Sequence, residues 1–129
     1  MPGCVVVADD DPIIVDLVKL RLDMAQYEVV TTDDAGAVPA MVRARRPVLV
    51  ILDVRMPGGG GLSALSAIKT DPETCTIPVM MLTGERNPAT VLLAMQSGAD
   101  DYVVKPFHPD ALLQRVSRLA GRNSNTVLI

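Results

Sequence analysis

The chain has 129 residues, a formal net charge of −3 and 49% apolar residues, with one Phe, two Tyr and no Trp. This length fits a single domain with an aliphatic core, and the acidic balance argues against direct binding of nucleic acid through a basic face. No apolar run is long enough to cross a membrane, the N-terminus lacks a signal-peptide pattern and the two cysteines have no metal-binding spacing, so we expect a cytoplasmic protein with free thiols.

Short apolar runs alternate with segments of helical spacing in the first half of the chain. Residues 4–8 are wholly apolar, which predicts a strand buried on both faces, and residues 12–24 predict a helix with a proline in its first turn. Residues 27–31 predict a second strand. A second helix is expected at 36–46, where a proline is tolerated only in the first turn, and residues 48–52 predict the third strand.

The same alternation continues in the second half. The four glycines at 58–61 predict a flexible loop, followed by a helix at 62–69, a loop at 70–77 and a strand at 78–82. A helix at 88–97, a strand at 102–104 and a helix at 109–120 complete the pattern, with Gly98 and Gly121 expected to end the two helices. We therefore place one domain at residues 1–121 and a C-terminal tail, or the start of a linker, at 122–129.

Five strands that alternate with five helices predict an α/β fold with a doubly wound parallel sheet and right-handed crossovers. Five strands in a chain of this length fit the flavodoxin-like order 2-1-3-4-5 better than a six-stranded dinucleotide-binding fold. In that order the first and third strands are neighbours. The crevice at their carboxyl ends is the place where such sheets bind ligands.

Polar residues follow four of the five predicted strands. They are Asp9, Asp10 and Asp11, then Asp53, then Thr83, and finally Lys105. Each has an ordinary explanation by itself, such as a helix cap, a loop carboxylate, a β-branched strand end or a solvated charge. All of them nevertheless fall at one edge of the sheet, where mutually repelling carboxylates gathered with a lysine indicate a metal-assisted phosphoryl site.

Four segments carry a resemblance to a known family. They are VVVADDDP (5–12), LVILDVRMPGGGGL (49–62), IPVMMLTG (77–84) and GADDYVVKPF (98–107). In order, spacing and position at strand ends, the chain resembles the receiver domain of bacterial two-component response regulators over residues 4–120. The resemblance implies a signalling switch that promotes its own phosphorylation and dephosphorylation but is not a turnover enzyme. Its phosphoryl donor would be the phosphohistidine of a sensor histidine kinase or a histidine phosphotransfer protein.

The resemblance also implies a role for individual residues. Asp53 would be the phosphoacceptor, Asp10 a direct Mg2+ ligand and Asp9 a ligand acting mainly through water. The backbone carbonyl of Arg55 would complete the coordination by the protein. These oxygen ligands suit Mg2+, which also retains several waters.

The remaining matched residues would bind the phosphoryl group and relay its presence. Lys105 would be the phosphate-binding lysine, Thr83 the switch hydroxyl and Tyr102 the aromatic switch. Their movement would change the surface made by the fourth helix, fifth strand and fifth helix. The isomer of the Lys105–Pro106 peptide bond stays open at this point.

Two alternatives keep the fold but change the function. A pseudo-receiver would bind a protein partner without phosphorylation, although every matched site residue is present. A phosphatase of the haloacid dehalogenase type would need an acid where Arg55 stands, and a flavin-binding protein would need a hydroxyl-rich loop in place of three aspartates.

Self-association is expected to be weak. Acidic residues at 100, 101 and 110 and arginines at 115 and 118 could form ion pairs across a dimer, but the predicted helix 88–97 carries no charge. We expect a monomer before phosphorylation and at most weak association afterwards. The sequence names neither the cognate kinase nor the output, and it predicts no contact with nucleic acid or membrane.

Overall fold

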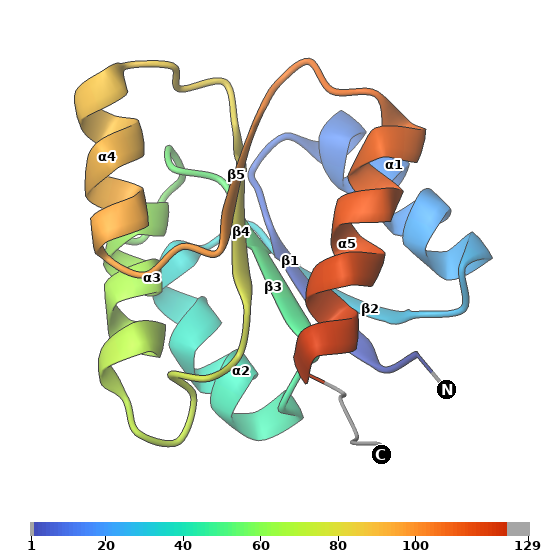
Figure 1. Cartoon of the computed structure of the whole chain (residues 1–129), viewed down its shortest axis with the longest axis horizontal. Coiled ribbons are helices and arrows are strands. Elements are labelled where there is room, and N and C mark those ends of the chain that lie inside the picture. Colours follow the sequence, from blue (N-terminus) through green and yellow to red (C-terminus); the bar gives the residue numbers. More distant parts are fainter. Residues whose placement is uncertain (1, 124–129) are drawn as a thin grey trace.

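A five-stranded parallel sheet lies between two layers of helices in the computed structural model, which describes the backbone of residues 2–123 (Figure 1). The strands are β1 (Cys4–Ala8), β2 (Glu28–Thr32), β3 (Leu49–Leu52), β4 (Val79–Thr83) and β5 (Asp101–Val104). The helices are α1 (Pro12–Met24), α2 (Val38–Arg45), α3 (Gly61–Thr70), α4 (Pro88–Gln96) and α5 (Pro109–Asn123). The strand order β2-β1-β3-β4-β5 confirms the predicted topology.

Helices cover both faces of the sheet: α1 and α5 lie on one face, and α2, α3 and α4 lie on the other (Figure 1). Alternate residues of β1 therefore enter different cores. Val5 and Val7 join a cluster with residues of α1 and α5, whereas Val6 and Ala8 join a cluster with residues of α2 and α3. This burial on both sides explains why the central strands are apolar throughout.

Most predicted boundaries lie within one or two residues of the observed ones, with two informative differences. The predicted second helix is divided: a 3-10 turn (Ala35–Ala37) precedes α2, and Pro39 lies in the first turn of α2. The prediction that Gly121 ends the last helix is wrong, because α5 continues to Asn123. A β-carbon at Gly121 would meet nothing nearby, so the exposed glycine imposes only its modest helix-propensity cost, about 1 kcal/mol.

The glycine-rich segment after β3 is closely packed at two points. A β-carbon at Gly58 would lie 1.8 Å from a carboxylate oxygen of Asp34, and one at Gly61 would lie 1.8 Å from the carbonyl oxygen of Asp53. Gly58 also has a positive φ of 86°. These positions exclude side chains, so the expected flexible loop is instead a tight connection between β3 and α3.

The predicted tail is only partly covered by the structure. Its first residues belong to α5, and residues 124–129 lie outside the described part of the chain. Within residues 2–123 there is no helix whose length and apolar character would let it cross a membrane.

Candidate functional site

The register of the sheet brings the predicted site residues to one edge. Ala8 and Leu52 are partners across β1 and β3, so the residues that follow them are adjacent, and the Asp53 amide donates to the Ala8 carbonyl at 3.0 Å. On the other side, Thr83 is the last residue of β4 and Lys105 follows β5. Four segments distant in sequence therefore converge through strand pairing alone.

Three carboxylates form a group that could hold a metal ion. One oxygen from each of Asp9, Asp10 and Asp53 lies within 4.8 Å of the others. Asp9 and Asp53 are buried, with 4% and 7% of their surfaces exposed, whereas Asp10 is exposed. The third acid of the triplet has a different role, because the Asp11 side chain accepts from the Ile13 amide and caps α1.

Lys105 is the positive centre of this group. Its ammonium donates to Asp9 at 2.6 Å and to Asp53 at 2.9 Å. The Lys105–Pro106 peptide bond is cis, and the Lys105 amide donates to the Thr83 carbonyl at 2.8 Å. A single lysine that follows the edge strand β5 therefore neutralises carboxylates that follow two central strands, β1 and β3.

Backbone amides complete the hydrogen bonding of both buried acids. The second oxygen of Asp9 accepts from the Asp11 amide at 3.0 Å, and that of Asp53 accepts from the Arg55 amide at 3.2 Å. All four oxygens of Asp9 and Asp53 thus have a donor.

The two buried acids differ in their protonation equilibria. Burial raises the pKa of Asp9, and the hydrogen bond from Lys105 only partly opposes it. Burial also disfavours ionised Asp53, but hydrogen bonds from Lys105, the Thr83 hydroxyl and the Arg55 amide outweigh it and lower the pKa of Asp53. For Lys105, hydrogen bonds to both acids outweigh the opposing effect of burial and raise its pKa. Asp53 is therefore ionised at neutral pH beside an ammonium, as a nucleophilic carboxylate must be.

Tyr102 lies on β5 and packs against the core on the face of the sheet that α2, α3 and α4 cover. Its hydroxyl donates to the Glu85 carbonyl at 2.8 Å, and the Glu85 amide donates to the Thr83 hydroxyl oxygen at 3.2 Å. Sequence reasoning missed Glu85. The sequence did contain a signal for it. Glu85 lies two residues after Thr83, Arg55 lies two residues after Asp53, and the two side chains have opposite charges.

A groove of about 540 Å³ lies beside the carboxylates, toward β2. Its lining residues include Asp9, Asp10, Asp16, Thr32 and Asp33. Sequence reasoning missed this groove as well, because it is created where the loops after β1 and β2 meet. It reaches the site from the side of α1 and is strongly acidic.

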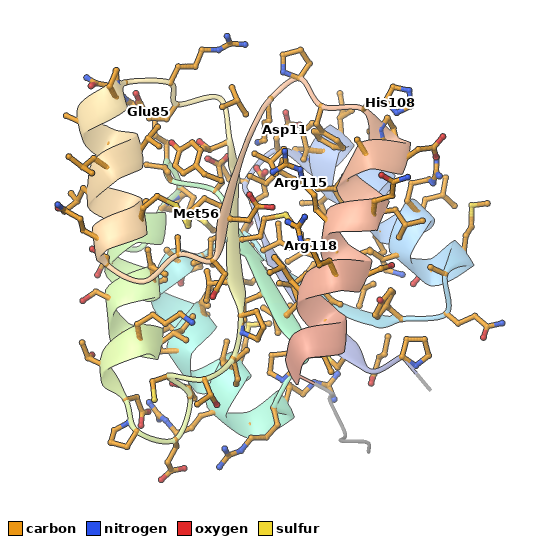
Figure 2. All side chains as sticks on the ribbon, in the orientation of Figure 1. Asp11, Met56, Glu85, His108, Arg115 and Arg118 are labelled. Atoms are coloured by element: carbon orange, nitrogen blue, oxygen red, sulfur yellow. The ribbon has the colours of Figure 1, made fainter. Side chains whose placement is uncertain are left out.

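The charges considered for self-association are paired within the chain. Asp101 accepts from Arg115 at 2.7 Å and from Arg118 at 3.4 Å, and Figure 2 shows both arginines on the side of α5 toward β5. Asp110 pairs with Arg21 of α1. The α4–β5–α5 face therefore does not depend on a partner to satisfy these charges.

Comparison with known proteins assigns the chain to a family. The profile of the response regulator receiver domain matches residues 5–117. The chain belongs to the response regulator receiver domain family. It is 34% identical over 121 residues to the DNA-binding response regulator MtrA of Mycolicibacterium smegmatis, covering 94% of this chain and 52% of MtrA.

Two further relatives agree with this assignment. The chain is 36% identical over 118 residues to the DNA-binding dual master transcriptional regulator RpaA of Synechocystis, covering 92% of this chain and 49% of RpaA. The crystal structure of chemotaxis protein CheY4 of Vibrio cholerae superposes with a TM-score of 0.83 at 32% identity, over 91% of this chain and 98% of CheY4. The receiver spans about half the length of the curated relatives it matches.

These comparisons confirm the predicted family, fold and general function. The chain is the receiver domain of a two-component response regulator, a phosphorylation-dependent signalling element. A pseudo-receiver, a phosphatase and a flavin-binding protein are not favoured. Receiver domains are generally not turnover enzymes.

Proposed function

We propose that Asp53 of this receiver accepts the phosphoryl group. The observation that carries this proposal is the contact of Lys105 with Asp53 at 2.9 Å, in a group of three converging carboxylates. A buried carboxylate held ionised beside an ammonium is a suitable nucleophile for phosphorus. The ammonium also offsets the charge that the transferred group brings to the site.

The transfer forms one bond and breaks one. A carboxylate oxygen of Asp53 attacks the phosphorus of a phosphohistidine, the phosphorus–nitrogen bond breaks, and its electron pair stays on the imidazole. Lys105 and the Thr83 hydroxyl bind oxygens of the transferred group. Water later attacks the phosphorus of the acyl phosphate, which releases inorganic phosphate and restores the carboxylate.

The donor set fits Mg2+. Asp9, Asp10, Asp53 and the Arg55 carbonyl offer only oxygen atoms, which this cation prefers, and three of the four donors carry negative charge. When bound, Mg2+ would neutralise charge on the phosphoryl oxygens and on the carboxylates. We propose Asp10, which is exposed, as a direct ligand and Asp9, which is buried and accepts the shorter hydrogen bond from Lys105, as a ligand through water.

Switching follows from Thr83 and Tyr102. Movement of the Thr83 hydroxyl toward the phosphoryl group changes the space beside Tyr102, and the ring position changes the α4–β5–α5 surface. The added charge at Asp53 thus shifts the α4–β5–α5 surface from one of two arrangements to the other.

The partners follow from the same chemistry. A sensor histidine kinase or a histidine phosphotransfer protein supplies the phosphoryl group, since His108 lies at the start of α5 rather than in the site (Figure 2). MtrA and RpaA are DNA-binding regulators, which supports residues 1–121 as a receiver joined through a linker to an output domain. We propose a monomeric receiver in the cytoplasm that does not itself bind nucleic acid.

The test is labelling by a small phosphodonor, acetyl phosphate, followed by intact-mass analysis. The unmodified sequence should gain one phosphoryl group with Mg2+ and none with EDTA. Asp53→Asn should not be labelled, whereas the matched control Asp23→Asn, on the exposed surface of α1, should be labelled fully. Undiminished labelling of Asp53→Asn contradicts the assignment. Calorimetric titration with Mg2+ should show a greater loss of affinity for Asp10→Asn than for Asp9→Asn.

A further inference from the structure

An ion pair links the segments that follow β3 and β4. The Arg55 Nε donates to a carboxylate oxygen of Glu85 at 2.9 Å, and a terminal nitrogen of the same guanidinium contacts that oxygen. The Arg55 side chain is 79% exposed, but the Glu85 side chain is only 11% exposed. The pair therefore joins a solvated cation to a mostly covered carboxylate.

Glu85 is fixed by each of its polar groups. Its other carboxylate oxygen accepts from the Asn87 amide at 3.0 Å, and its own amide donates to Thr83 at 3.2 Å. Its carbonyl accepts from the Tyr102 hydroxyl at 2.8 Å. Glu85 belongs to the segment between β4 and α4, and Figure 2 shows it close to the end of α4 where that helix begins. The acceptor for Tyr102 thus belongs to the residue that Arg55 holds.

We propose that the Arg55 side chain is a positioning residue for Tyr102 and acts through Glu85. The contact itself stands independently of phosphorylation, but its importance in signalling rests on the function proposed above. The Arg55–Glu85 pair connects the segment after Asp53 to Tyr102, in addition to the connection through Thr83.

The Arg55–Glu85 pair is sensitive to the charge at Asp53. The Glu85 carboxylate raises the pKa of the Arg55 guanidinium, and the charge of Asp53 adds to this effect. A phosphoryl group adds about 1.5–2 negative charges at Asp53, whose charge already acts on this guanidinium. The phosphorylated Asp53 then competes with Glu85 for Arg55. A weaker ion pair with Arg55 leaves Glu85 less firmly positioned, and the Glu85 carbonyl is the acceptor for the Tyr102 hydroxyl.

An ordinary exposed ion pair would not have this effect, because solvent screens it and both side chains stay mobile. This pair differs in two respects. Both carboxylate oxygens of Glu85 have donors, and the Glu85 backbone has partners on each side. Release of Arg55 therefore removes one restraint from Glu85, a residue that contacts both Thr83 and Tyr102.

The test uses the tyrosine content of the chain, which is two. In a Tyr27→Phe background, incorporation of 3-fluorotyrosine gives one 19F resonance, from Tyr102. Spectra are recorded with EDTA and no phosphodonor for Arg55→Met, Arg55→Lys, Glu85→Gln and the double variant Arg55→Met with Glu85→Gln. The matched control is Arg45→Met, which removes an exposed arginine paired with Glu28 on the far side of the molecule.

We expect the resonance to move toward the position of free fluorotyrosine in Arg55→Met and Glu85→Gln, less far in Arg55→Lys, and not at all in Arg45→Met. The double variant should match either single variant, because the two residues act through one contact. Resonances of Arg55→Met and Glu85→Gln that superimpose on the parent overturn the inference, and so does an equal shift in Arg45→Met. Failure of Asp53 labelling would contradict only the proposed function, since these spectra need no phosphorylation.

Discussion

The acidic site and helix α4 are held in very different ways. In the site, both oxygens of Asp9 and of Asp53 accept hydrogen bonds, and both residues are buried. In α4, Ala94 is the one buried residue, no residue is charged, and three large apolar side chains are exposed: Leu92, Leu93 and Met95. The buried, hydrogen-bonded site is therefore the rigid part of the domain, and α4 is the part that can change its position.

Phosphoryl transfer needs fixed geometry, since reacting groups that are misplaced by about 1 Å contribute much less to the rate. A responding element instead needs a small free-energy difference between its arrangements, which a weakly buried helix provides. If this contrast holds, substitutions in the site should cost far more stability than substitutions in α4.

The largest expected difference is between two Leu→Ala substitutions, one beside the acidic site and one in α4. Leu52, directly before Asp53, is fully buried, so Leu52→Ala should lower the free energy of unfolding by about 3 kcal/mol. Leu92 of α4 is 58% exposed, so Leu92→Ala should lower it by about 0.5 kcal/mol or less. Urea denaturation measures both. Equal losses would mean that α4 is held as firmly as the site.

Removal of the shared lysine tests whether the site is held by charge. Lys105→Met leaves Asp9 and Asp53 without their common donor, and we expect a loss of about 2 kcal/mol at pH 7 in EDTA. The same substitution at Lys19, whose pair with Asp23 is exposed on α1, should cost about 0.5 kcal/mol or less. A Lys105→Met protein as stable as Lys19→Met would contradict the bridging role.

The opposite pKa directions of the two acids predict opposite pH dependences. Asp53 has a folded pKa below 3.8, so it stabilises the fold at neutral pH, and this contribution is lost as the pH falls through that lower value. Asp9 has a folded pKa above 3.8, so its ionisation opposes folding, and protonation as the pH falls toward 3.8 adds stability.

Urea denaturation across acidic pH in EDTA measures these two effects. As the pH falls from neutral, the parent should gain stability relative to Asp9→Asn above pH 3.8 and lose stability relative to Asp53→Asn below it. Changes of the same sign for both variants would show that the pKa values of the two acids are not shifted in opposite directions.

The smallest expected effect concerns the face that α4 shares with β5 and α5. Arg115 and Arg118 are largely exposed, and Asp101, at 14% exposure, also accepts from the Tyr102 amide at 2.8 Å, so Arg115→Ala with Arg118→Ala should lower stability by only about 0–1 kcal/mol. Light scattering at about 10–100 μM should report a monomer for the unphosphorylated parent, because weak interfaces would be visible at these concentrations. A stable dimer that survives both substitutions would contradict this account.

The sequence sufficed for the fold and for the convergence of Asp9, Asp53 and Lys105. Each of these residues directly follows an apolar strand, and parallel strands end at one edge, so element order alone brings them together. The same reasoning placed Thr83 at the end of β4.

Other features depend on tertiary structure that no local pattern encodes. The contacts of Glu85 depend on the path of the segment after β4, and the pairing of Arg115 and Arg118 with Asp101 depends on how α5 packs against β5. Gly121 carries a local stop signal that the helical context overrides. Gly58 suggested flexibility, whereas its lack of a side chain serves close packing against Asp34.

An anion at Asp53 should change the α4–β5–α5 face, which includes the weakly buried α4, through Thr83. Hydrogen exchange over residues 84–120, with and without beryllofluoride and Mg2+, measures this directly. We expect altered protection in α4, β5 and α5 of the parent, with the amides of β1 and β3 unchanged apart from those next to the site. Thr83→Ala should bind the analogue, detected by a 19F signal of bound fluoride, yet show a much smaller change in that face. Equal exchange responses in the parent and in Thr83→Ala would contradict the claim.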